Sequence, residues 1–151
     1  MTAAPGTRRR VVAVIGDGSA APPLRALARE IGRLLVERGF RVVTGGLGGV
    51  MEAASEGARS AVAYREGDVI GILPGAEAEQ ANPFVDVVIP SGLGIARNAL
   101  VVSTADAVVA VGGGSGTLSE IAMAWQLGKP VIALAVGGWG WCFGCAPTSA
   151  S

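Results

Sequence analysis

The chain has 151 residues, of which half are hydrophobic and 16% are charged, and its formal net charge is zero. This length is enough for one domain with a substantial core. The charges are balanced and the only obvious basic run is Arg8-Arg9-Arg10, so the sequence lacks the basic face that a nucleic-acid partner requires.

Missing residue types and short apolar runs narrow the function further. The chain contains no histidine, which excludes His-based acid–base catalysis, Ser-His or Cys-His nucleophile pairs and histidine metal sites. The apolar stretch 99–111 is interrupted by Ser103, Thr104 and Asp106, so it does not reach the length of a membrane span. Val11–Ile15, after the arginine run, is too short for a signal peptide. We therefore expect a cytoplasmic protein with no metal site and no membrane partner.

Short apolar runs alternate with helical patterns from one end of the chain to the other. Strands are predicted at Val11–Ile15, Phe40–Val43, Asp68–Leu73, Val85–Ile89, Ala107–Val111 and Val131–Val136. Helices are predicted from Pro22 to the stop at Gly39, from Val50 to Ala61, over Gly94–Thr104, and from Thr117 to Gly128.

The continuous apolar character of these strands predicts a mainly parallel sheet that is buried on both faces. The expected fold class is therefore α/β, a Rossmann-like, doubly wound sheet with helices on both faces. The link between the third and fourth strands has no room for a good helix, which leaves the strand order beyond the third open. We expect one domain over residues 1–136, and an irregular Gly/Trp/Cys tail over 137–151 in place of a further strand and helix.

Two helices show clear apolar spacing. In the first, Leu24, Leu27, Ala28, Ile31, Leu34 and Leu35 fall on one face. In the last, the spacing i, i+3, i+4, i+7 is given by Leu118, Ile121, Ala122 and Trp125.

Three glycine-containing loops each follow a predicted strand, at 16–19, 45–49 and 112–116. A buried strand that leads through glycines into a helix leaves bare backbone N–H groups at the positive end of the helix dipole, which suits a phosphate. Right-handed crossovers place these loops and the segment around Arg97 at one edge of the sheet. The predicted ligand-binding residues are Gly16, Gly18, Ser19, Gly45, Gly46, Gly48, Gly49, Arg97, Asn98, Gly113, Gly114, Ser115, Gly116 and Thr117.

Two of these loops carry specific motifs. Residues 113–120 read GGSGTLSE and match GGxGTxxE, and residues 45–51 read GGLGGVM and match GG-x-x-G-[LV]-M. Over residues 10–136 the chain resembles the LOG-like (SLOG) superfamily, formerly called lysine decarboxylase-like, and is most similar to its molybdenum cofactor carrier branch. The resemblance implies a carrier that binds a phosphorylated nucleotide or a molybdopterin-type cofactor, and not a lysine decarboxylase. It also implies a homo-oligomer, a dimer or higher, and the fold itself requires no cofactor.

The same superfamily contains the cytokinin-activating nucleoside 5′-monophosphate phosphoribohydrolases, which release a free base and ribose 5-phosphate. Under that alternative, Arg97 and Glu120 match the positions that act on the ribosyl bond. The enzymes usually have Lys where this chain has Asn98, and Pro where it has Gly112. These departures favour holding a ligand over cleaving it, and a degenerate member kept as an interaction partner is a third possibility.

Glu120 also has a purely structural interpretation. Thr117-x-x-Glu120 has the form of a capping box, in which Thr at the N-cap and Glu at N3 bond reciprocally to backbone N–H groups. Cys142 and Cys145 follow Trp141 as in a thioredoxin-type WCxxC, but too few residues remain after them for the helix that such a site needs. We expect two reduced cysteines there, with neither a redox role nor a zinc site.

Overall fold

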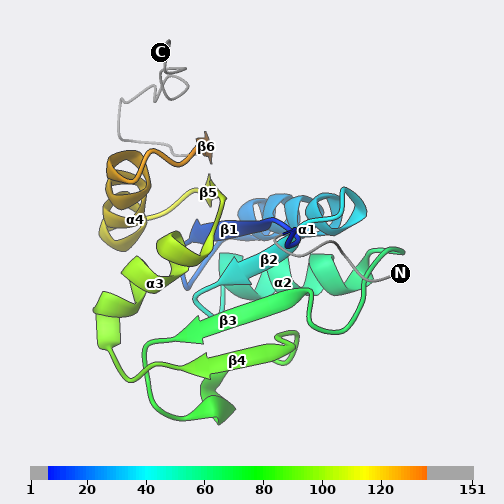
Figure 1. Ribbon diagram of the computed structural model, residues 1–151, viewed down its shortest axis with the longest axis horizontal. Coiled ribbons are helices and arrows are strands. Elements are labelled where there is room, and N and C mark those ends of the chain that lie inside the picture. Colours follow the sequence, from blue (N-terminus) through cyan, green and yellow to red (C-terminus); the bar gives the residue numbers. More distant parts are fainter. Residues whose placement is uncertain (1–6, 136–151) are drawn as a thin grey trace.

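The computed structural model describes residues 7–135, which form a single parallel sheet with helices on both faces (Figure 1). Its order is β4-β3-β2-β1-β5-β6, and every neighbouring pair is parallel. The strands are β1 (Val11–Gly16), β2 (Arg41–Thr44), β3 (Val69–Leu73), β4 (Val87–Pro90), β5 (Ala107–Val111) and β6 (Val131–Leu134). The predicted Rossmann-like, doubly wound α/β fold is confirmed, and the order changes direction between β1 and β5.

The helices divide between the two faces of this sheet. One face is covered by α1 (Pro22–Glu37) and α2 (Val50–Ser60), the other by α3 (Arg97–Thr104) and α4 (Ser115–Gln126). Short 3₁₀ turns, η1 and η2, lie at Ala78–Gln80 and Gly94–Ala96. Within residues 7–135 no helix is both long and apolar enough to cross a membrane.

Successive side chains of β1 point alternately into two apolar cores. Val12 and Val14 pack on the side of α1 and α2, and Val11, Ala13 and Ile15 pack on the side of α3 and α4. All five are at least nine-tenths buried. This is why the strand reads as an unbroken apolar run instead of an alternating one.

Two glycines bring α1 and α2 into backbone contact. A Cβ on Gly32 would lie 2.0 Å from the carbonyl oxygen of Ala54, and a Cβ on Gly57 would lie 1.8 Å from that of Arg29. Glycine at these two positions therefore allows the backbones of α1 and α2 to pack directly against each other. Leu34, predicted to share the buried face of α1, is 39% exposed.

The predicted start of the fourth strand is two residues too early. The backbone N–H of Phe84 donates to Asn82 Oδ1 and that of Val85 to the Asn82 carbonyl, so these residues form a turn before β4 begins at Val87. At the other end of the sheet β6 stops at Leu134. Val136, the expected tail over 137–151 and both cysteines lie outside the described residues.

Candidate functional site

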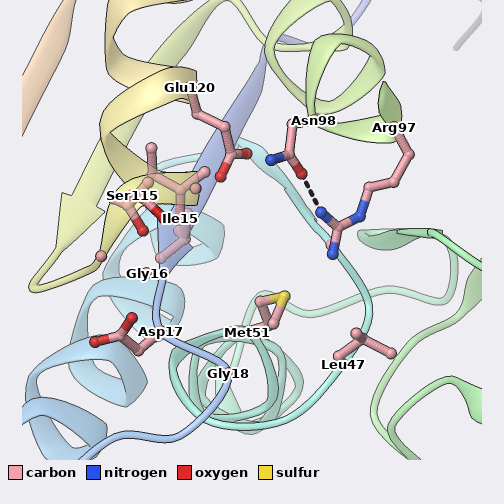
Figure 2. Close-up of a pocket in the computed structure, with 15 residues that line it drawn as sticks. Ile15, Gly16, Asp17, Gly18, Leu47, Met51, Arg97, Asn98, Ser115 and Glu120 are labelled. Carbon is pink, nitrogen blue, oxygen red and sulfur yellow. Dashed lines mark hydrogen bonds between the residues drawn. The ribbon is translucent and has the colours of Figure 1, made fainter. Parts of the chain in front are cut away.

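The carboxyl ends of β1, β2 and β5 open into a pocket of about 370 Å³ (Figure 2). It lies where the strand order changes direction, which is the usual ligand position in an open α/β sheet. The lining residues are Val14, Ile15, Gly16, Asp17, Gly18, Gly45, Leu47, Met51, Arg97, Asn98, Gly114, Ser115, Gly116, Thr117 and Glu120.

The last glycine loop places the start of α4 at this pocket. Gly114 is the N-cap and the helix begins at Ser115. The N–H groups of the first helical turn have no acceptor inside the helix, and they coincide with the positive end of its dipole. Gly113 has a φ of +121°, and a Cβ there would lie 2.4 Å from the hydroxyl oxygen of Thr117. Glycine at this position therefore allows the buried Thr117 side chain to pack directly beneath the loop.

The glycine loop after β1 also packs tightly against its neighbours. A Cβ on Gly16 would lie 2.5 Å from the carbonyl oxygen of Val111 and 2.8 Å from the side chain of Val50. The carbonyl oxygen of Asp17 accepts the N–H of Val50, which joins this loop to the start of α2. These contacts fix the backbone at the carboxyl end of β1.

Arg97 lies over the second glycine loop instead of the last one. Its Nε donates to the carbonyl oxygen of Ile72 at 3.1 Å, and its Nη1 donates to Asn98 Oδ1, the bond drawn in Figure 2. A Cβ on Gly45 would lie 2.6 Å from Nη2 of the same guanidinium group. Burial lowers the pKa of Arg97, and the nearby Glu120 opposes that effect. Arg97 is the one cationic side chain among the described residues that line the pocket.

Glu120 is the buried carboxyl group of the site. Its residue is 8% exposed, and Figure 2 shows the carboxyl group directed from α4 into the pocket, on the side where Asn98 lies. Burial raises its pKa to about 7, although the charge of Arg97 lowers it in part. Burial therefore favours the neutral, protonated form of Glu120.

The capping box predicted for Glu120 is wrong. The helix starts two residues before Thr117, so Thr117 occupies the third helical position instead of the N-cap, and the helix has no side-chain capping bond. Within residues 7–135 the Glu120 carboxyl group makes no hydrogen bond. A buried carboxyl group without a structural partner that opens onto a pocket is typical of a functional residue.

Asp17 gives the pocket a second acidic side chain. Its Oδ1 lies 3.4 Å from the position that a Cβ on Gly114 would take, close to the start of α4. Figure 2 shows Asp17 and Arg97 on opposite sides of the pocket. The site therefore has an acidic end and a basic end.

Most of the residues predicted to bind a ligand are brought together here. Those that line the pocket are Gly16, Gly18, Gly45, Arg97, Asn98, Gly114, Ser115, Gly116 and Thr117, with Glu120 beside them. Those that do not line it are Ser19, Gly46, Gly48, Gly49 and Gly113. Gly46, Gly49 and Gly113 have positive φ values, so they shape the loops without facing the pocket.

The prediction missed Val14, Ile15, Asp17, Leu47 and Met51. Leu47 and Met51 lie within the GGLGGVM motif, and Asp17 lies between two glycines of the first loop, so motif membership could have identified these three. Val14 and Ile15 belong to a buried strand and carry no such signal.

Comparison with known proteins identifies the family. Residues 9–146 match the model of the SLOG cluster4 family. The chain belongs to this family. An uncharacterized protein of Archaeoglobus fulgidus is 42% identical to it over 123 residues, covering 82% of this chain and 78% of the relative.

Two solved structures of similar sequence extend the comparison. The molybdenum cofactor binding protein from the phototrophic bacterium Rippkaea orientalis is 41% identical with a TM-score of 0.79, covering 85% of this chain and 77% of that one. The Moco carrier protein from Chlamydomonas reinhardtii is 36% identical with a TM-score of 0.74, covering 84% of this chain and 76% of that one. The predicted superfamily and its molybdenum cofactor carrier branch are thereby confirmed.

Proposed function

We propose that this SLOG protein holds a phosphorylated small molecule in the pocket at the start of α4 and releases it unchanged. The ligand is a molybdopterin-type cofactor or a nucleotide. One observation carries this proposal. The glycine-lined strand ends, the first turn of α4 and Arg97 all line the same pocket of about 370 Å³. That volume falls within the usual range for small-molecule sites. Similarity to a molybdenum cofactor binding protein and to a Moco carrier protein supports the same ligand class.

The proposed phosphate position is the first turn of α4. The N–H groups of Ser115, Gly116 and Thr117 provide donors, and the helix dipole favours a negative charge there. Gly114 has no side chain that would keep a phosphate away from this backbone. Asp17, at the same end, would repel a phosphate that came too close, so we assign it to a hydroxyl or amino group of the ligand.

The other end of the pocket offers a different set of contacts. Arg97 supplies the charge that partly neutralises the ligand, while Asn98 keeps the guanidinium group in place. Burial favours the protonated form of Glu120, which can donate a hydrogen bond as well as accept one. Holding and release require no covalent step.

Glu120 is also the specific observation that favours a second candidate, a nucleoside 5′-monophosphate phosphoribohydrolase. In that reaction a carboxylate stabilises the positive charge that develops on the ribosyl carbon, or activates the attacking water. An unpartnered, buried carboxyl group with a pKa of about 7, facing an arginine, is suited to that task. Asn98, in place of the lysine usual in such enzymes, favours the carrier.

One pair of substitutions at Gly116 tests binding. A Cβ there meets its nearest neighbour, Asn98 Nδ2, at 3.8 Å, so a side chain fits without a clash. Titration calorimetry with AMP, GMP and molybdopterin should give at least a tenfold weaker affinity for Gly116→Asp, because the new carboxylate repels a phosphate at the start of α4. The matched variant Gly116→Ala should bind nearly as well as the native protein. Equal affinities in the Asp and Ala variants would contradict the proposed phosphate position.

Product analysis separates holding from cleaving. The native protein is incubated with AMP and GMP, and free base and ribose 5-phosphate are measured by chromatography. Binding without product supports the carrier. The opposite result is turnover that Glu120→Gln abolishes. If the control Glu56→Gln, which changes a surface carboxylate of α2, leaves that turnover unchanged, the phosphoribohydrolase is established and the carrier is refuted.

A further inference from the structure

The charges that line the pocket do not balance once a phosphate is bound. Among the described lining residues the charged side chains are one cation, Arg97, and two acids, Asp17 and Glu120. A phosphate group carries a charge of about −1.5 to −2 at pH 7. If both acids were ionised, two carboxylates and a phosphate would therefore share a single guanidinium group. A proton on one of the two acids reduces this imbalance.

Glu120 is the acid that is placed to hold this proton. Its residue is 8% exposed, its carboxyl group is directed into the pocket (Figure 2), and it has no hydrogen-bond partner among residues 7–135. Asp17, in the loop after β1, is only partly buried. An ionised carboxyl group is more costly where it is buried than where water reaches it, and burial accordingly raises the pKa of Glu120.

The elements packed against α4 offer Glu120 little compensation for a negative charge. Glu120 is the one charged residue of α4, and in α3, β1, β5 and β6 the one charged residue is Arg97. The Arg97 guanidinium group is held by the carbonyl oxygen of Ile72 and by Asn98 Oδ1, and it forms no ion pair with Glu120 within residues 7–135. Lys129, which precedes β6, donates its Nζ hydrogens to carbonyl oxygens at the end of α3. A proton is therefore the simplest way to neutralise this carboxyl group.

We propose that the pocket binds its phosphorylated ligand together with one proton, which Glu120 holds, so that the ligand is bound more tightly at neutral pH than at alkaline pH. This rests on the proposed phosphate position at the first turn of α4. Glu120 follows that turn on the same helix, so a phosphate there disfavours the ionised carboxyl group and favours the protonated one. By linkage, the proton strengthens ligand binding by the same factor. The proton comes from solvent and returns to it when the ligand leaves.

The affinity for AMP, measured by titration calorimetry against pH, tests this coupling. The phosphate of AMP is largely dianionic from pH 7 upward, so its own titration does not interfere. The dissociation constant of the native protein should rise about tenfold between pH 7 and pH 9, whereas that of Glu120→Gln, which cannot ionise, should stay nearly level. Asp17→Asn should keep the rise, because Asp17 is not the group that takes up the proton. The cysteines and the amino terminus also titrate in this range, but all three proteins contain them.

Proton uptake is also measurable in the native protein itself. At pH 8 the heat of AMP binding should differ between HEPES and Tris buffers, whose ionisation enthalpies differ, in proportion to the protons taken up. The native protein should take up a substantial fraction of one proton, and Glu120→Gln should take up almost none. If both proteins bind AMP with the same dependence on pH, the coupling is overturned and the carrier function stands. If the native protein binds no AMP at any pH, the proposed phosphate position is refuted, and the coupling with it.

Discussion

Replacing Glu120 with glutamine should change how the stability of the fold depends on pH. The glutamine keeps the size of the side chain but cannot ionise. In the folded protein burial raises the pKa of Glu120 from 4.5 to about 7. The unfolded chain therefore loses this proton first as the pH rises from 4.5 to 7, and the native protein loses stability across that range. Above pH 7 both states are ionised and the loss becomes constant.

The size of the effect follows from the shift of the pKa. A pKa raised from 4.5 to about 7 corresponds to a free-energy difference of about 3 kcal/mol, which is the penalty that the native protein carries at pH 8 and that Glu120→Gln lacks. In a domain of this size such a difference moves the thermal midpoint by roughly 10 °C.

Urea denaturation at a series of pH values between 4 and 9 measures this directly. The free energy of unfolding of Glu120→Gln, minus that of the native protein, should rise by about 3 kcal/mol between pH 4.5 and pH 8 and then stay level. Glu56→Gln, on the surface of α2, is the control and should show no such rise. A difference that is the same at every pH would refute the assignment of a raised pKa to Glu120.

Three further predictions concern the frame around the site. Gly57→Ala should lower the free energy of unfolding by about 3 kcal/mol in urea titrations, because its Cβ would lie 1.8 Å from the carbonyl oxygen of Arg29; a neutral variant would show that α1 and α2 do not pack this closely. Lys129→Met should cost about 1–2 kcal/mol in the same assay, since three carbonyl groups at the end of α3 lose their donor, and an unchanged midpoint would contradict that role. The hydrogen bond with Arg8 and the N–H of Val11 keep the pKa of Asp106 well below its usual range, so Asp106→Asn should destabilise the protein at pH 7 and progressively less below pH 4. Thermal melts at pH 7 and pH 3 check this, and a cost that does not shrink at pH 3 would be evidence against it.

The local signals in the sequence were sufficient for the fold class and for most of the site. Unbroken apolar runs such as Val11–Ile15 indicate strands that are buried on both faces, and this requirement is local to each strand. Because every parallel strand ends at the same edge of the sheet, glycine loops after the strands had to meet there. That argument was enough to bring Gly16, Gly45 and Gly114 to one pocket.

Details that depend on distant contacts could not be predicted in this way. The helical spacing predicts that α4 starts at Thr117, where Thr-x-x-Glu has the form of a capping box, whereas the helix begins at Ser115 and leaves Glu120 without a capping bond. Likewise, the direction of the Arg97 side chain is set by the carbonyl oxygen of Ile72 and by Asn98. Neither partner could be inferred from the glycine motifs.

Local apolar patterns and the short-range geometry of glycine are enough to predict a Rossmann-like α/β domain with glycine loops at one edge of a parallel sheet, and the resemblance of the loop motifs indicates the SLOG family. Which side of α4 is buried depends instead on its tertiary contacts. The apolar spacing of Leu118, Ile121, Ala122 and Trp125 predicts one helical face, but only Ile121 of these is buried, while Leu118 and Trp125 are exposed. The packing of α4 against β5 and α3 turns Glu120 inward, where burial raises its pKa, and leaves Trp125 outside.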